Sequence, residues 1–443
     1  MPWKPEVTTE TAKSTPNAGW CRLPAVLLLL APILSLHKSL VMAPALSAMA
    51  AWFLWCLIAG GGARPSFQAA LGAHRRVLVP LALLWLWCMG ASLWSFRPLS
   101  CLVSGLMLGG TIAGGWIAAV ALARIDERGR RLLIQSLAAG LAVAGAAMVV
   151  CGVIERAHLA DIGHVLWDMD AATTIVALLV WPVFAWLDHF GRRAAGLVLV
   201  LLCLAGVLLS HDLAAKVAFI LAILVLGPAR LLPKATFPLM AAMAVGLCLA
   251  APWAALSLPA PQVSAGWSWL PSSAHHRLTI WSFAAHHIAD KPLVGWGFDS
   301  ARAIPGGKTR VPVVRMTGCK AEDPLIEVPG FDHPVPGDCV TWEESLPLHP
   351  HDAWLQVWLE LGAVGALLVA WGMAAVIWSG ARMARPATAA ATLAVGLVVC
   401  SVSFGAWQSW WLSTLWIAAA LLLTPADAGS AAGHHLGKPR TLV

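Results

Sequence analysis

Apolar runs long enough to cross a lipid bilayer recur along most of this sequence. The hydrocarbon core of a bilayer is about 30 Å thick, and a helix of roughly 20 apolar residues spans it. Hydrophobic residues make up 59% of the 443 residues and charged residues 12%, whereas soluble domains average about 45–50% and about 25%. A soluble enzyme, a disordered chain and a fibrous chain are therefore excluded. We predict an all-α integral membrane protein.

The length of the apolar runs predicts about twelve transmembrane helices. The predicted spans are residues 22–36, 39–60, 77–94, 99–122, 131–154, 172–188, 193–209, 213–229, 235–257, 353–379, 387–404 and 407–424. They divide the chain into an N-terminal membrane region of about nine helices (1–257), a large loop (258–352) and a C-terminal membrane region of about three helices with a tail (353–443). No clear signal-peptide cleavage site follows the first run, so we expect it to be retained as a helix.

Charge in the loops predicts the orientation of these spans. Every second short loop is rich in arginine, as around Arg75, Arg128, Arg192 and Arg382. The positive-inside rule places these loops and both termini in the cytoplasm of a bacterium, and the large loop, with short helices, in the periplasm. The protein would then lie in the inner membrane. A net charge of +7 could suggest nucleic acid, but the basic residues are spread over short loops, so we expect no nucleic-acid partner.

The chain has ten cysteines, and eight of them lie in or beside apolar runs, where we expect small buried side chains. Cys319 and Cys339 differ because both lie in the large polar loop. In an oxidising periplasm they could form a disulfide that closes a loop of about 20 residues. Two unpaired thiols are the alternative.

Two basic residues are candidates for binding phosphate. Arg277 lies in a predicted helix near the membrane surface, and its guanidinium suits two phosphate oxygens. That phosphate could belong to a lipid diphosphate or to ordinary lipid headgroups. Lys216 lies within a predicted span, four residues after Asp212. A charge at membrane depth indicates function, and an ion pair with Asp212 is the alternative.

Two histidines flank a proline where the large loop enters the tenth predicted span. His349 or His351 could act as a general base, because histidine takes up a proton near neutral pH. Alternatively, the segment could cap the helix with Asp352 as the N-cap residue, or be polar loop. Two histidines alone are too few for a metal site. Four more histidines, which we read as surface helix residues rather than a metal cluster, are His275, His276, His286 and His287.

The motifs of the large loop resemble the O-antigen ligase family, which shares this region with O-antigen polymerases and protein O-oligosaccharyltransferases. The family order is Arg-x-x-x-Trp, Pro-Leu-x-Gly-x-Gly, His-x-His-Asn-x-x-Leu-Gln and Glu-x-Gly-x-x-Gly. The matching residues here are Arg277, Trp281, Pro292, Gly295, Gly297, His349, His351, Leu355, Gln356, Glu360, Gly362 and Gly365. The twelve-span layout with a long loop before the tenth span is also similar. Two positions depart from the family pattern: Asp352 replaces the usual Asn, and Lys216 is the candidate for a basic residue, often Arg, in an earlier span.

The resemblance implies a glycosyltransferase whose donor is a polysaccharide on undecaprenyl diphosphate and whose acceptor is a sugar hydroxyl of lipid A–core, among membrane lipids. It implies His349 or His351 as the base and Arg277, helped by Lys216, as the group that stabilises the departing diphosphate. The implied supporting residues are Asp352, Gln356, Glu360, Trp281, Gly295 and Gly297. Diphosphate is already a good leaving group, so the resemblance implies no metal, nucleotide or other cofactor. A direct displacement would invert the anomeric centre.

Three other functions remain compatible with the sequence. A polysaccharide polymerase would use the same donor with a growing glycan as acceptor, and a protein O-oligosaccharyltransferase would modify a protein. A lipid-linked oligosaccharide flippase would be no enzyme, and it should line its membrane interior with many charges. Here the charged candidates gather at one face. The sequence leaves open the sugars, the oligomeric state and the choice between His349 and His351.

Overall fold

The computed structural model describes residues 18–61, 63–158, 169–259, 261–267, 269–270, 272–315 and 323–424. Within these ranges a helix forms at every predicted span. The helices are α1 (Arg22–Ser35), α2 (Met42–Ala59), α3 (Ala63–Gly90), α4 (Pro98–Leu122), α5 (Glu127–Arg156), α7 (Asp170–His189), α8 (Arg193–Leu209), α9 (Leu213–Leu231), α10 (Pro233–Leu256), α13 (Ala353–Gly380), α14 (Pro386–Val402) and α15 (Ser409–Leu423). Short 3-10 turns precede α1 and α2 and follow α3: η1 (Ala18–Cys21), η2 (Ser39–Val41) and η3 (Ala91–Leu93).

These helices identify a multi-pass membrane protein. In the described part of the chain, eight helices are long and apolar enough to cross a membrane: α2, α3, α4, α5, α7, α9, α10 and α13. The shorter apolar helices, of 10–17 residues, are α1, α8, α14 and α15. The all-α membrane class is thus confirmed for the bundle, while twelve complete crossings remain a prediction.

Helix α3 begins at Ala63, well before the predicted start at residue 77. The residues between are mostly alanine, leucine, glutamine and arginine, which favour helix without being uniformly apolar. A hydropathy criterion therefore misses this extension. As a result, Arg75 and Arg76 lie on a helix and not in a loop as predicted.

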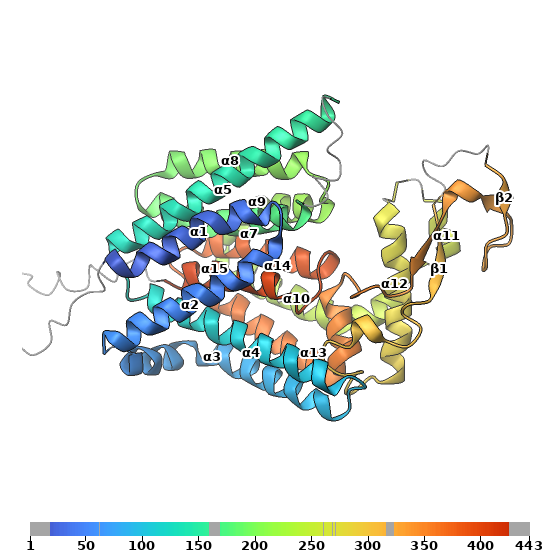
Figure 1. Cartoon of the computed structure of the whole chain (residues 1–443), viewed down its shortest axis with the longest axis horizontal. Coiled ribbons are helices and arrows are strands. Elements are labelled where there is room, and N and C mark those ends of the chain that lie inside the picture. Colours follow the sequence, from blue (N-terminus) through green and yellow to red (C-terminus); the bar gives the residue numbers. More distant parts are fainter. Residues whose placement is uncertain are drawn as a thin grey trace, which may run out of the picture.

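Helix α7 forms the centre of the bundle. It packs against α5, α8, α14 and α15, and 83% of its most apolar window is buried. A helix that is apolar on all sides has to be surrounded in this way or by lipid. On the other side of the bundle, α13 packs between α3 and α10 (Figure 1).

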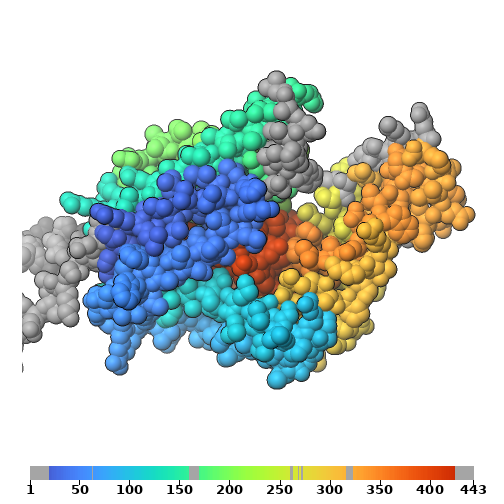
Figure 2. All heavy atoms as spheres, in the orientation of Figure 1, coloured from blue at the N-terminus to red at the C-terminus, as the bar shows by residue number. Residues whose placement is uncertain are grey.

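The large loop carries its own secondary structure at one end of the bundle (Figures 1 and 2). Its elements are α11 (Pro261–Ala265), α12 (Ser272–Asp290), η4 (Ala301–Ala303), β1 (Arg310–Val314), β2 (Leu325–Ile326), β3 (Val335–Pro336), η5 (Gly337–Cys339) and β4 (Val340–Glu344). Strand β1 pairs antiparallel with β4, and β2 with β3. The helix predicted around Arg277 is α12, and the loop also contains four short strands that we did not predict. Strands of two to five residues are too short to give a recognisable alternation.

The cysteines behave as two groups. Eight described cysteines are free and mostly buried, as expected of small apolar side chains. Cys339 is buried and disulfide-bonded. Cys319 lies outside the described residues, so the Cys319–Cys339 pairing remains a prediction.

Candidate active site

A break in α13 receives the glycine turn that follows α12. Gly362 has a left-handed backbone (φ 64°) that interrupts the helix. The broken turn leaves carbonyls without helical partners. The Trp296 amide donates to the Leu359 carbonyl (2.9 Å), and the Gly297 amide donates to the Glu360 carbonyl (2.9 Å). The Pro-Leu-x-Gly-x-Gly and Glu-x-Gly motifs, far apart in the chain, thus form one backbone joint.

Short distances to neighbouring backbone atoms explain why two positions in this joint are glycine. Gly295 has φ +68°, and a Cβ there would lie 2.4 Å from the Glu360 carbonyl carbon. A Cβ on Gly362 would lie 2.3 Å from the Leu293 carbonyl carbon. Neither position has room for any side chain, and both need a backbone that only glycine adopts freely. Gly295, which the resemblance implied as a supporting residue, and Gly362 of the Glu-x-Gly motif therefore set the position of the loop on α13.

Glu360 is the polar centre of this joint. Its carboxylate is completely buried. It accepts hydrogen bonds from the Asp299 amide (2.8 Å), Trp407 Nε1 (2.7 Å), the Ala301 amide (3.1 Å) and Gln356 Nε2 (3.0 Å). These donors come from the glycine turn, from α13 and from the connection between α14 and α15. Glu360 therefore positions three segments around the site.

Replacing Glu360 with alanine should destabilise the protein strongly. Four donors, two of them in buried and two in partly buried hydrogen bonds, would lose their acceptor, and a fully buried unpaired group costs about 1–3 kcal/mol before relaxation. We expect a loss of about 3–5 kcal/mol in the free energy of unfolding. Thermal unfolding of detergent-purified protein measures it, with exposed Glu327→Ala as the control. Equal melting temperatures for the two variants would contradict this role.

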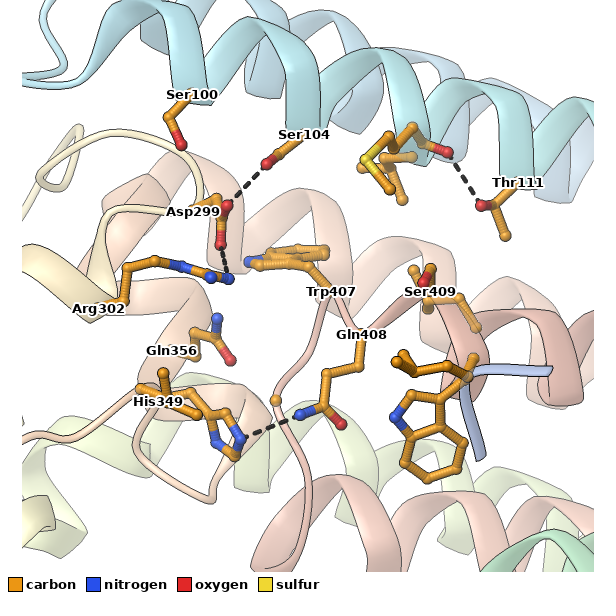
Figure 3. A pocket seen from close by; sticks show the side chains of 17 residues that line it. Ser100, Ser104, Thr111, Asp299, Arg302, His349, Gln356, Trp407, Gln408 and Ser409 are labelled. Carbon is orange, nitrogen blue, oxygen red and sulfur yellow. Dashed lines mark hydrogen bonds and ion pairs between the residues drawn. The ribbon is translucent and has the colours of Figure 1, made fainter. Parts of the chain in front are cut away.

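The histidine pair has a defined arrangement of ring protons. His351 Nδ1 lies 2.7 Å from the Ser403 carbonyl oxygen and must donate to it, so the lone pair is on Nε2. His349 Nδ1 accepts from the His351 amide (3.2 Å), so its proton is on Nε2. That proton faces the Gln408 side-chain amide at 3.2 Å. The structure places the Gln408 nitrogen there (Figure 3). Exchanging the amide oxygen and nitrogen of Gln408 supplies the acceptor that this proton needs and also satisfies an otherwise unpartnered Oε1.

Both histidines are neutral at pH 7. Burial, together with the neighbouring His351, Arg302 and Arg277, lowers the pKa of His349 to about 3. Burial also lowers the pKa of His351. The hydrogen bond to Ser403 raises this pKa, whereas the charge of Arg277 lowers it further. The rings lie 4.4 Å apart, and His351 has a left-handed backbone (φ 55°). Of the two, only His351 has a lone pair that is not already held by a donor in the described structure.

Arg277 lies close enough to the histidines to affect both of them. It is on α12, one turn before Trp281, whose Nε1 donates to the Pro350 carbonyl (2.8 Å) between the histidines. Burial lowers the pKa of Arg277, and the charges of Asp212 and Asp170 raise it. Arg277 makes no hydrogen bond or ion pair within the described ranges. Within the described structure, no side chain therefore occupies the hydrogen-bonding positions of its guanidinium.

Lys216 lies in the same electrostatic neighbourhood. The expected alternative, an ion pair with Asp212, does not form among the described residues. Asp212 instead caps α9: its carboxylate accepts from the Ala215 amide (3.0 Å) and the Thr174 hydroxyl (3.1 Å). Asp212 and Asp170 act electrostatically on both Arg277 and Lys216, so the same two carboxylates lie within electrostatic reach of each predicted cation.

A cavity of about 510 Å³ lies beside His349 (Figure 3). It is bounded by α4, by the loop after the glycine turn and by the connection from α14 to α15. Asp299 pairs there with Arg302 (2.9 Å) and accepts from the Ser104 hydroxyl (2.6 Å). Trp407, Gln408 and Trp410 complete the wall next to His349.

His275 is only 4% exposed, so its prediction as a surface helix residue was wrong. The other three histidines of α12 have local partners. His286 and His287 bond to the carbonyls four residues earlier in α12, and His276 bonds to the Glu344 carbonyl. No cluster of three or more histidine, cysteine, aspartate or glutamate side chains suited to a metal occurs in the described part of the chain.

Comparison with known proteins identifies the region that contains these residues. A sequence model of the family described as O-Antigen ligase matches residues 197–370. This range runs from α8 into α13 and includes Lys216, Arg277, both site histidines and Glu360. This region of the chain is therefore similar to the O-antigen ligase family.

Individual relatives agree with this assignment. Proteins of Rickettsia felis and Rickettsia typhi, each described as "Putative polysaccharide ligase", are 27% and 28% identical to the chain. The alignments span 60% and 57% of this chain and the same shares of the relatives' own length. A Rickettsia bellii protein of the same description is 24% identical over 75% of this chain and 76% of its own. The chain thus spans about 60% of the length of the first of these relatives. Each of these relatives is thus described as a putative polysaccharide ligase, and the similarity to this chain is partial.

The O-antigen ligase motif departs from its usual pattern at Asp352, and the structure shows what that residue does. The Asp352 carboxylate accepts from the Leu355 amide (2.9 Å) and caps α13. Burial raises the pKa of this carboxyl to about 7. Asn and Asp are comparable N-cap residues, so the replacement preserves the start of the helix.

Sequence reasoning missed several residues that surround the O-antigen ligase motif. Asp299, Arg302, Trp407 and Gln408 belong to no predicted motif, and Ser104 lies in a predicted span. The one available signal was proximity in sequence, because Asp299 follows the glycine turn directly. Gln408 and Ser104 lie outside the matched range and reach the site only through folding.

Proposed function

We propose that this protein is a glycosyltransferase that moves polysaccharide from undecaprenyl diphosphate to a sugar hydroxyl of lipid A–core. The reaction would take place at the periplasmic face of the inner membrane, during lipopolysaccharide assembly. One arrangement carries the proposal. His351 presents a ring-nitrogen lone pair within electrostatic reach of Arg277. The Arg277 guanidinium is partly buried and has no ion pair in the described structure.

The geometry supports His351, rather than His349, as the base. As the acceptor hydroxyl oxygen forms a bond to the anomeric carbon, His351 Nε2 takes its proton. The bond from that carbon to the diphosphate oxygen breaks, and the diphosphate leaves with the electron pair. Arg277 and Lys216 stabilise the negative charge that develops there. Attack from the side opposite the diphosphate inverts the anomeric centre.

The cavity beside His349 suits the acceptor sugar. Among the described residues, the one cation that lines this cavity, Arg302, already forms an ion pair with Asp299, whereas Arg277 has no ion pair. The hydroxyl groups of a sugar can hydrogen-bond to the paired Asp299 carboxylate and Arg302 guanidinium and to the Gln408 amide. Trp407 and Trp410 offer flat apolar surfaces to the faces of a sugar ring. Donor diphosphate and acceptor sugar would thus lie on opposite sides of the histidine pair.

A reconstituted transfer assay tests the function. Purified protein would be incubated with lipid-linked O-antigen and lipid A–core, in EDTA and without nucleotide. We expect polysaccharide to become attached to lipid A–core. Lengthening of the donor instead would establish a polymerase, and transfer to a protein acceptor alone would establish an oligosaccharyltransferase. Lipid translocation without any transfer would indicate a flippase.

The pH dependence of transfer tests the base. His351 must be neutral to accept a proton, and its pKa lies below its ordinary value of 6.5. The neutral form therefore predominates at pH 7 and is lost as the pH falls through the lowered pKa. We expect kcat/KM to be level near neutral pH and to fall tenfold per pH unit on the acid side. Because Arg277 helps lower this pKa, Arg277→Gln should move the acid limb to higher pH in whatever activity remains.

A further inference from the structure

A second groove lies at the opposite end of the bundle from the histidine pair. It has a volume of about 480 Å³ and lies between α3, α10 and α13. Helix α13 has 28 residues, which places its two ends about 40 Å apart. The histidines precede the first residue of α13, and Arg382 follows its last turn. The groove is therefore separate from the candidate active site.

Three arginines line this groove. Arg75 and Arg76 lie on α3, and Arg382 lies just after α13. All three are exposed, and no ion pair of theirs occurs in the described ranges. No aspartate or glutamate is among the lining residues. The groove therefore concentrates positive charge without an internal counter-ion.

The rest of the groove is apolar and faces outward. Trp371 and Trp378 lie two turns apart on one side of α13 and are 48% and 46% exposed. The Arg382 guanidinium lies 5.6 Å from the Trp378 ring centre. Alanines at 241, 374 and 375 form the floor between them. A ligand that fills this space needs both an anionic head and apolar chains.

We propose that this groove binds an anionic phospholipid, with a headgroup of two phosphates preferred over one. Guanidinium groups match phosphate oxygens in pairs, and three of them suit more than one phosphate. Basic pockets between transmembrane helices on the cytoplasmic side are known to suit such headgroups. The predicted orientation puts the groove on that side. The acyl chains would lie along Trp371, Trp378 and Val79.

Native mass spectrometry of the detergent-purified full chain tests this binding. The probes are cardiolipin, phosphatidylglycerol, phosphatidylcholine and inorganic diphosphate. The test variant replaces Arg75, Arg76 and Arg382 with glutamine. The control replaces three exposed arginines elsewhere, Arg128, Arg192 and Arg230, with glutamine and makes the same change in net charge.

Wild type and control should bind cardiolipin more tightly than phosphatidylglycerol, and the test variant should bind at least about tenfold more weakly. The test variant should keep its transfer activity, because none of its changes touches the candidate active site. Equal binding by the test variant, or equal binding of phosphatidylcholine, would overturn the proposal. Displacement of the lipid by millimolar inorganic diphosphate would assign the groove to a soluble ligand instead. If the triple variant fails to fold, Arg76→Gln alone should weaken cardiolipin binding a few-fold, and unchanged binding would again overturn it.

Discussion

Replacing Arg277 with alanine is expected to lower the rate of polysaccharide transfer by roughly 10²–10³-fold. Its guanidinium is partly buried, lacks an ion pair in the described structure and lies near the histidine pair. Without it, the charge that develops on the diphosphate would be stabilised by Lys216 alone. Single-turnover transfer from lipid-linked donor to lipid A–core measures the loss.

Two further variants separate charge from shape. Arg277→Lys keeps the positive charge but loses the paired donors, so its rate should lie between wild type and Arg277→Ala. Arg310→Ala removes an exposed arginine from the same large loop and should leave transfer unchanged. If Arg277→Ala retained wild-type activity with normal folding, the proposed diphosphate site would be wrong.

Replacing His351 with glutamine is expected to lower kcat by roughly 10²–10⁴-fold. The Ser403 carbonyl holds the His351 proton on Nδ1 and so leaves the lone pair on Nε2. The change to glutamine removes this lone pair. The acid limb of the pH profile should disappear with it, because no titrating base remains. Transfer kinetics from pH 5 to pH 8 give both readings in one experiment.

His349→Asn is the matched comparison for this experiment. An asparagine oxygen can still accept the His351 amide hydrogen that His349 Nδ1 accepts. We therefore expect a smaller loss, of about tenfold, with the acid limb retained. The opposite result, a profile without an acid limb in His349→Asn and an intact one in His351→Gln, would assign the base to His349.

Most of the membrane helices could be predicted because each apolar run is much longer than the few residues over which its ends are ambiguous. Helix α8 has the predicted bounds, Arg193–Leu209, and α9, α13 and α14 differ by one or two residues. The large deviation is α3, whose first part is helical without being uniformly apolar. The small strands β1 to β4 were missed because each is too short to show a period. Helix existence is a local property of the chain, whereas strand pairing requires a partner elsewhere.

The candidate site was predictable only where its residues follow one another in a motif. Arg277, His349, His351 and Glu360 were identified by resemblance, and the structure places the first three in one neighbourhood. The role of Glu360 could not be predicted, because its four donors come from segments up to 61 residues away. The same holds for the cavity around Asp299.

The sequence by itself determined that this chain lies in a membrane, where most of its helices begin and end to within a few residues, with the start of α3 as the exception, and which motifs are candidates for chemistry. These properties depend on hydropathy and on residue order, and both can be obtained directly from the sequence. Tertiary structure alone decided which histidine presents a lone pair, because Ser403, the carbonyl that holds the His351 proton, lies 52 residues further on. It also decided that Arg277 has no partner among the described residues while Arg302 has one. Hydrogen-bond direction and charge pairing depend on distances between atoms, and folding sets those distances.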